Sequence, residues 1–189
     1  MLLHKIKPIL QEIPESDERA VARAKEDPGA FEGLYKKYYA EIFRFVFKKV
    51  QNKEDTGDIV SRVFVKSFNS IHQFQYKGIP YSAWLYRVAI NEANQYFNRN
   101  KIRHVVIDEH LSSSIAFELK SDQDKEQLLD RLPTILNRLK PKEIELIELR
   151  FYEGMSYKQM GDILNMTENN CKVKTFRTLK KLKNLMNHG

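Results

Sequence analysis

The sequence predicts an all-α protein built from two small helical domains that a flexible linker joins. The chain of 189 residues contains only 7 Gly and 6 Pro, so long stretches carry no helix breaker. Apolar residues recur at the three- to four-residue spacing of helices that bury one face. This periodicity fades between about residues 101 and 125 and is present on both sides of that gap. The pattern therefore indicates one helical domain before the gap and another after it.

The first domain is expected over residues 16–100, after an N-terminal extension of residues 1–15 that contains two prolines. Ser16 is a suitable N-cap for a first helix because acidic residues follow it directly. An Asp-Pro-Gly sequence ends this helix, and Gly57 is expected in a later turn. Longer helices with one apolar stripe are predicted over residues 31–50, about 59–71 and 81–98. Their stripes are rich in aromatic residues, which we interpret as core packing.

The linker is predicted over residues 101–125, where polar stretches show no helical period. Fully extended, its 25 residues would reach roughly 80 Å at about 3.3 Å per residue. One turn of DNA is about 34 Å long. The linker is therefore long enough for the flanking domains to contact DNA sites two turns apart.

The second domain is expected over residues 126–189 and contains the most specific local motif. Ser156 can cap a short helix over residues 157–164, and Thr167 can cap a second helix that begins at Glu168. The three-residue turn between them contains the apolar Met166 at its corner. Gly161 is expected to permit a close approach of the two helices. This arrangement predicts a helix-turn-helix, which presents its second helix to the major groove of DNA.

The second helix of this motif is strongly cationic from Lys172 to Lys183 and contains no acidic residue there. The whole chain carries a net charge of +7, which also favours a polyanionic partner. A solvated terminal helix would show the same charge, but the capped helix and turn before it favour DNA binding. The residues predicted to face the domain are Phe176, Leu179, Leu182, Leu185 and Met186. Base or phosphate contacts are expected from Asn169, Asn170, Lys172 and Lys174.

Several function classes are disfavoured by the composition. Cys171 is the single cysteine, so the chain has no disulfide framework and no cysteine-based metal cluster. The five histidines form no cluster, and the acidic residues show no catalytic spacing. No stretch approaches the roughly 20 apolar residues of a membrane-spanning helix, and the N-terminus lacks the pattern of a signal peptide. We therefore expect a cytoplasmic protein that is not an enzyme, inserts in no membrane and needs no metal or cofactor.

Both halves together resemble RNA polymerase sigma factors of the extracytoplasmic-function (ECF) group of the sigma-70 family, over roughly residues 16–187. Residues 139–143 and 149–157 resemble the part of sigma region 4 that leads into its helix-turn-helix. Residues 30–39 resemble the start of region 2, residues 55–68 resemble region 2.2, and residues 74–91 resemble region 2.3 running into region 2.4. The ordered pair of regions with a linker between them is more specific than the helix-turn-helix alone.

The resemblance implies a function and a set of partners. Such a protein directs core RNA polymerase to promoters, through the β′ coiled coil and the β flap of the polymerase, and an anti-sigma factor is a further expected partner. The residues expected to bind core polymerase are Asp58, Ile59, Val60, Val63 and Phe64. Those expected at the −10 element, where one extruded base would enter a pocket near residues 74–81, are Phe74, Tyr76, Asn91, Asn94, Asn98 and Arg99. Those expected at the −35 element are Thr167, Asn169, Asn170, Lys172, Lys174 and Arg177.

One departure from the family and one alternative function need testing. The family usually carries Gln-Glu where this chain has Ser61-Arg62, so the expected docking surface has a reversed charge at one point. The alternative is a helix-turn-helix regulator that works independently of polymerase. Such a regulator would need an effector or receiver domain, and residues 31–98 show neither the βα alternation of a receiver nor a nucleotide loop.

Overall fold

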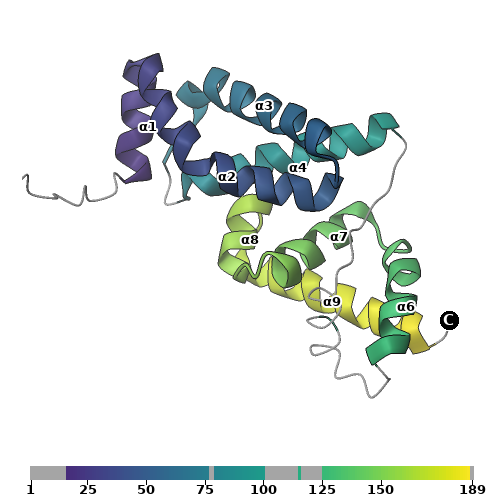
Figure 1. Ribbon diagram of the computed structural model, residues 1–189. Helices are drawn as coiled ribbons and strands as arrows, with labels where there is room; N and C mark the ends of the chain where they lie inside the picture. The colour runs from purple at the N-terminus through teal and green to yellow at the C-terminus, as the bar shows by residue number, and fades with distance from the viewer. Residues whose placement is uncertain (1–15, 77–78, 101–114, 116–124, 188–189) are drawn as a thin grey trace, which may run out of the picture.

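The computed structural model describes residues 16–76, 79–100, 115 and 125–187, and all regular structure in these ranges is helical (Figure 1). The predicted all-α fold is thus confirmed. The helices, in chain order, are α1 (Asp17–Glu26), α2 (Phe31–Val50), α3 (Lys53–Asn69), α4 (Tyr81–Asn100), α6 (Lys125–Leu136), α7 (Pro141–Ile147), α8 (Tyr157–Leu164) and α9 (Glu168–Asn187). Shorter helical turns are the 3₁₀ segments η1 (Pro28–Ala30) and η2 (Ile71–Gln73) and the π-helical segment η3 (Glu148–Tyr152).

Helix starts in the first half follow local capping chemistry. The Ser16 hydroxyl accepts a hydrogen bond from the Arg19 backbone N–H at 3.4 Å, as the sequence predicts for α1. The expectation of a turn at Gly57 is wrong, because Asn52 caps α3 and Gly57 lies inside that helix. The Asn52 carboxamide oxygen accepts hydrogen bonds from the backbone N–H groups of Glu54 and Asp55. A cap of this kind, worth about 1 kcal/mol, offsets the cost of about 1 kcal/mol for glycine inside a helix.

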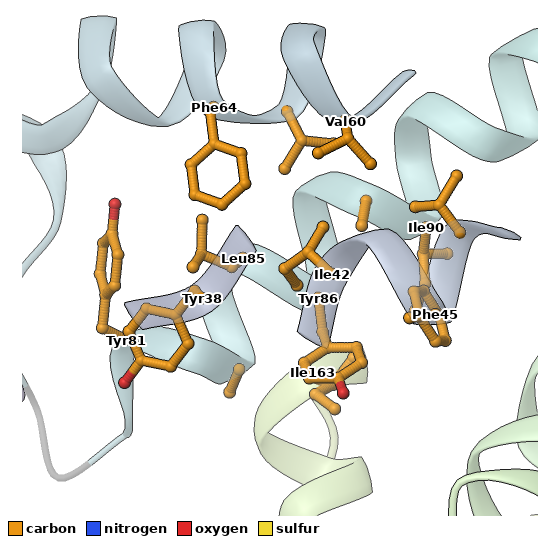
Figure 2. Packing of buried hydrophobic residues seen from close by; sticks show 14 of the residues in the cluster. Tyr38, Ile42, Phe45, Val60, Phe64, Tyr81, Leu85, Tyr86, Ile90 and Ile163 are labelled. Atoms are coloured by element: carbon orange, nitrogen blue, oxygen red, sulfur yellow. The ribbon is translucent and has the colours of Figure 1, made fainter. Parts of the chain in front are cut away.

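The core of the first half lies between α2, α3 and α4 and is rich in aromatic side chains. Figure 2 shows Ile42 of α2, Val60 of α3 and Leu85 of α4 meeting in its centre, and all three are fully buried. Tyr86 packs edge-on against Phe45, with ring centroids 4.8 Å apart. The interpretation of the aromatic residues as core packing is therefore confirmed for these rings.

The second half has an aliphatic core of its own between α6, α7 and α9. It includes Leu132, Leu136 and Leu182, each fully buried. Ile115 belongs to the same cluster and is also fully buried, although it falls within the predicted linker. The rest of residues 101–124 lies outside the described residues.

The two halves pack against each other, which the sequence did not predict. The core of the first half continues into α7, η3, α8 and the start of α9, through Leu146, Leu149, Met160, Ile163 and Cys171. The helix α8 packs against α4, below the first half in Figure 1. In Figure 2, Ile163 of α8 lies next to the ring of Tyr86. The first half thus covers an apolar face of the helix-turn-helix domain.

Candidate nucleic-acid interface

The helix-turn-helix has the capping bonds that its sequence predicts. The Ser156 hydroxyl accepts a hydrogen bond from the Gln159 backbone N–H at 3.2 Å, and the Gln159 side chain accepts one from the Ser156 N–H at 2.9 Å. This reciprocal pair is a capping box, and it fixes the start of α8. At the start of α9, the Thr167 hydroxyl accepts from the Asn170 N–H at 3.2 Å. Both predicted caps are confirmed.

Gly161 is required by a close approach of backbone to backbone. A Cβ atom built at this position would lie 2.6 Å from the carbonyl oxygen of Met166. The turn that follows α8 therefore folds back directly over Gly161, after Asn165 adopts a left-handed conformation with φ of 55°. The predicted close approach is confirmed, although the neighbour is the turn backbone. Only glycine fits there without displacing the turn.

The residues predicted for the upstream element are on the exposed side of α9 or, in the case of Thr167, at its N-cap. Thr167, Asn169, Asn170, Lys172, Lys174 and Arg177 are all exposed. Their hydrogen-bonding groups and positive charges stand on a helix that a rigid turn orients. The arrangement can place one helix in a major groove while the cationic side chains contact phosphates.

The prediction that Phe176 faces the domain is wrong, because this side chain is 68% exposed. Leu179, Leu182 and Met186 are buried as predicted, and Cys171, Thr175 and Thr178 complete the buried stripe of α9. Two threonines thus occupy inward positions, and Phe176 lies about 100° around the helix from Thr175. Sequence reasoning missed this because it assigned apolar residues to the inside and threonine to the outside. The four-three-four spacing of the stripe was the signal that could have revealed it.

The residues predicted to bind polymerase require a correction. Asp58 is exposed, but Ile59, Val60 and Val63 are fully buried and Phe64 is 4% exposed. These four side chains form the inward stripe of α3, where they hold the helical bundle together. The outer face of α3 instead presents Val65, which is 59% exposed, and Phe68, which is 41% exposed. Exposed apolar side chains of this kind are more typical of a docking surface.

The unusual Arg62 has its charge partner inside the chain. Its Nε lies 3.4 Å from Oε2 of Glu92, a contact with the distance of an ion pair but without hydrogen-bond geometry. Lys66 Nζ donates a hydrogen bond to the other carboxylate oxygen of Glu92. Glu92 lies on α4 and its side chain is only 2% exposed. A buried carboxylate needs such compensation, and here Glu92 of α4 receives it from two cations of α3.

The predicted base pocket has a physical counterpart. A cavity of about 260 Å³ is lined by Gln73, Phe74, Gln75, Ile79, Trp84 and Arg87. Phe74 itself is not a free stacking platform, since it is 8% exposed and packs edge-on against Tyr81 at 5.3 Å. The structure therefore assigns Phe74, expected at the −10 element, to the wall of the cavity. Tyr76, in contrast, is 48% exposed, and it follows the cavity-lining residue Gln75 in the sequence.

The remaining residues predicted for the −10 element lie on α4. Asn91, Asn98 and Arg99 are exposed. Asn94 is partly buried, because its side-chain amide donates a hydrogen bond to a carboxylate oxygen of Glu145 in α7 at 2.8 Å. The structure therefore leaves three of these side chains open to a ligand and engages the fourth in a contact between the two halves.

The tyrosines that support this region stay uncharged at neutral pH. Burial raises the pKa of Tyr81, which lies beneath Phe74 and Trp84. Burial also raises the pKa of Tyr86 on the next turn of α4.

Among the described residues, no group of three or more His, Cys, Asp or Glu side chains could hold a metal ion. In the same ranges, no helix combines the length and apolar character needed to cross a membrane.

Both halves of the chain match known protein families. The family model for sigma-70 region 2 matches residues 34–103, and the model for sigma-70 region 4 matches residues 129–182. The ECF RNA polymerase sigma factor BldN of Streptomyces coelicolor is 27% identical over 159 residues, which cover 83% of this chain and 60% of BldN. The ECF RNA polymerase sigma factor SigM of Bacillus subtilis is 24% identical over 156 residues, which cover 82% of this chain and 94% of SigM.

Solved structures show the same fold. The structure of CnrH in complex with the cytosolic domain of CnrY aligns with a TM-score of 0.61 and 21% identity, over 92% of this chain and 98% of that one. The sigma factor RpoE from Bartonella quintana, in complex with the anti-sigma factor NepR, aligns with a TM-score of 0.52 and 20% identity. That alignment covers 84% of this chain and 97% of the other.

Proposed function

Because this chain belongs to the ECF group of the sigma-70 family of RNA polymerase sigma factors, we propose that it directs core polymerase to promoters through two separate DNA contacts. The observation that carries the proposal is the presence, on one chain, of an exposed cationic recognition helix and of a cavity walled by aromatic side chains. The helix suits a duplex element, and the cavity suits a base from an opened strand. The two region matches occur in the order that such a protein requires.

The upstream contact is assigned to α9. Lys172, Lys174 and Arg177 neutralise phosphates around the −35 element, while Asn169 and Asn170 reach base edges. Phe176 joins this surface, because an exposed phenyl ring can contact a thymine methyl group in the major groove. Thr167 is a positioning residue, since its hydroxyl caps the helix that carries the others.

The downstream contact is assigned to the cavity at the start of α4. An extruded base of the −10 element enters this cavity, and aromatic stacking of about 1–3 kcal/mol per base helps retain it. Asn91, Asn98 and Arg99 follow the strand along the exposed side of α4. No chemical step is needed for this role, so we propose that the chain has no catalytic activity and requires no cofactor.

Core polymerase is proposed to dock on the outer face of α3. Asp58, Val65 and Phe68 provide one acidic and two apolar contact points on this face. Arg62 shares the single carboxylate of Glu92 with Lys66, so these three side chains together carry one net positive charge. The β′ coiled coil is the proposed partner here and the β flap is the proposed partner of the C-terminal half. An anti-sigma factor is a further proposed partner, and all these contacts take place in the cytoplasm.

Promoter-specific run-off transcription with purified core polymerase tests the function. We expect specific transcripts from the mixture and none from core polymerase alone. A chain that fails to bind core polymerase but still binds duplex DNA would instead support the alternative, a regulator that works without polymerase. Mapping the 5′ ends of the transcripts would then identify both promoter elements.

The salt dependence of upstream-element binding tests the role of α9. Lys174→Ala and Arg177→Ala should each lower the magnitude of the salt slope by about one, because each variant loses one phosphate contact. Lys53→Ala is the control, since Lys53 is equally exposed but lies on α3. Unchanged affinity and unchanged slope in both α9 variants would contradict the assignment.

A further inference from the structure

Helix α1 precedes the part of the chain that matches sigma-70 region 2, yet it is tied to the cavity proposed for the −10 strand. The region 2 match begins at residue 34, whereas α1 covers Asp17–Glu26. Val21 and Ala24 of α1 are buried in the core of the first half. The same helix packs against α2, α4 and η2, the turn that leads into the cavity wall. Its place in the fold therefore allows α1 to act on that wall.

Lys25, in the last turn of α1, holds the cavity wall directly. Its Nζ donates a hydrogen bond of 2.6 Å to the carbonyl oxygen of Phe74, which lies 49 residues further along the chain. The contact is partly buried and its donor is charged, which makes it stronger than a hydrogen bond between neutral groups. The Phe74 N–H in turn donates to the Ile71 carbonyl oxygen at 3.1 Å. Both backbone polar groups of Phe74 are thus engaged.

The segment that Lys25 holds places two polar side chains at the cavity. Gln73 and Gln75 precede and follow Phe74, and both are exposed and line the cavity. The Phe74 ring packs on the other wall residue Trp84, with centroids 5.6 Å apart. A shift of the Phe74 backbone would therefore move both glutamines and loosen this ring contact. Because carboxamide groups can pair with base edges, the placement of the glutamines affects which base the cavity accepts.

The other end of α1 is fixed to α2. The Asp17 carboxylate accepts hydrogen bonds from Lys37 Nζ at 2.6 Å and from the Tyr38 hydroxyl at 2.5 Å. The Tyr38 ring lies 6.0 Å from that of Tyr81, which packs beneath Phe74. Helix α1 is therefore anchored at its start, and this anchor gives Lys25 a fixed base from which to hold the cavity wall.

We propose that Lys25 is a positioning residue for capture of the −10 strand, because it holds the Phe74 carbonyl and thereby sets the placement of Gln73 and Gln75 in the cavity. The proposal rests on the proposed function for the identity of the strand. In this role the Lys25 ammonium group binds the chain itself and not a DNA phosphate. A direct phosphate contact is the competing explanation, and the two predict different salt dependences.

The fluorescence of Trp84 tests the contact in the free, full-length protein. Trp84 is the single tryptophan of the chain and is half-buried against Phe74. Lys25→Met keeps a long unbranched side chain without the ammonium group, and it should increase the quenching of Trp84 by acrylamide. Lys25→Arg keeps a cationic donor and should retain the wild-type quenching. Arg19→Met removes the same charge from an exposed residue of α1 and should also retain it.

Strand binding by the complex with core polymerase tests the role in capture. The probe is a labelled single-stranded oligonucleotide that carries the −10 sequence. Lys25→Met should bind it on the order of tenfold more weakly, with an unchanged salt slope. A lost phosphate contact would instead lower the magnitude of the slope by about 0.7. Discrimination between the four bases at the extruded position should also fall in Lys25→Met, and Lys25→Arg should restore both affinity and discrimination.

Upstream-duplex affinity and thermal unfolding separate positioning from general stability. Lys25→Met should keep the wild-type affinity for the upstream duplex, because α9 provides that contact, and its helical content by circular dichroism. A lower thermal midpoint together with equal losses of duplex and strand affinity would show general destabilisation and overturn the proposal. Arg19→Met should match the wild type in all these measurements.

The remaining outcomes separate the role of Lys25 from the proposed function. Wild-type quenching and wild-type strand affinity in Lys25→Met would overturn the positioning role. Weaker strand binding with a reduced salt slope would show a direct phosphate contact and would overturn it as well. Absence of strand binding by the wild-type complex would instead contradict the proposed function. The quenching of Trp84 would then still report whether Lys25 holds the cavity wall.

Discussion

The two halves of this protein reach stability by different routes. The first half encloses a large aromatic and aliphatic core between α2, α3 and α4. The second half has a smaller aliphatic core, and the apolar side chains of Met160 and Ile163 are buried in the cluster of the first half. The helix-turn-helix domain is therefore partly covered by its neighbour. The comparison teaches that a DNA-binding unit can complete the burial of its apolar back face against a neighbouring domain.

The largest effect is expected from truncating the two cores at equivalent residues. Leu85 and Leu132 are both fully buried, the first in the core of α2–α4 and the second in that of α6–α9. Leu85→Ala and Leu132→Ala should each lower the free energy of unfolding by about 2–5 kcal/mol. Because the shared cluster couples the halves, both variants should shift one common urea transition monitored by circular dichroism. Two separate transitions, each sensitive to one variant, would show that the halves unfold independently.

An intermediate effect is expected at Gly161. Gly161→Ala forces a Cβ to within 2.6 Å of the Met166 carbonyl oxygen and should cost about 1–3 kcal/mol of stability. It should also weaken binding to the upstream duplex, because the turn that orients α9 must move. Thermal unfolding and a duplex binding titration measure these two effects.

Gly57→Ala is the matched control for that substitution. Gly57 is also inside a helix, but an added Cβ there would meet nothing within 4 Å. Alanine should therefore stabilise the protein by about 0.5–1 kcal/mol through its higher helix propensity. Similar destabilisation by both substitutions would mean that the close approach at Gly161 is not the cause.

The smallest effect on stability is expected at Phe176. Since its ring is 68% exposed, Phe176→Ala should change the free energy of unfolding by no more than about 0.5 kcal/mol. Affinity for the upstream duplex should nevertheless fall, with the largest loss at a base pair whose thymine methyl contacts the ring. Binding to a set of duplexes with single substitutions measures this.

Sequence reasoning predicted the motif-level features of the site well because they depend on local chemistry. The caps at Ser156 and Thr167 and the tight turn over Gly161 involve residues close together in the chain. It was less successful with the orientation of side chains. Phe176 was expected inside and is exposed, while Ile59 and Val60 were expected at a docking surface and are buried. Apolar character alone does not distinguish a core residue from a contact residue.

The sequence by itself determined the all-α fold, the helix-turn-helix and the cationic face of α9, because helical periodicity, capping residues and charge act within a few residues of one another. Only the tertiary structure decided that Glu92 pairs with Arg62, that Arg87 binds the end of α8, and that Lys49 pairs with Glu148. These contacts join residues far apart in the chain, such as Arg87 and Ile163. Their existence depends on how whole helices pack, and no local pattern in the sequence specifies that packing.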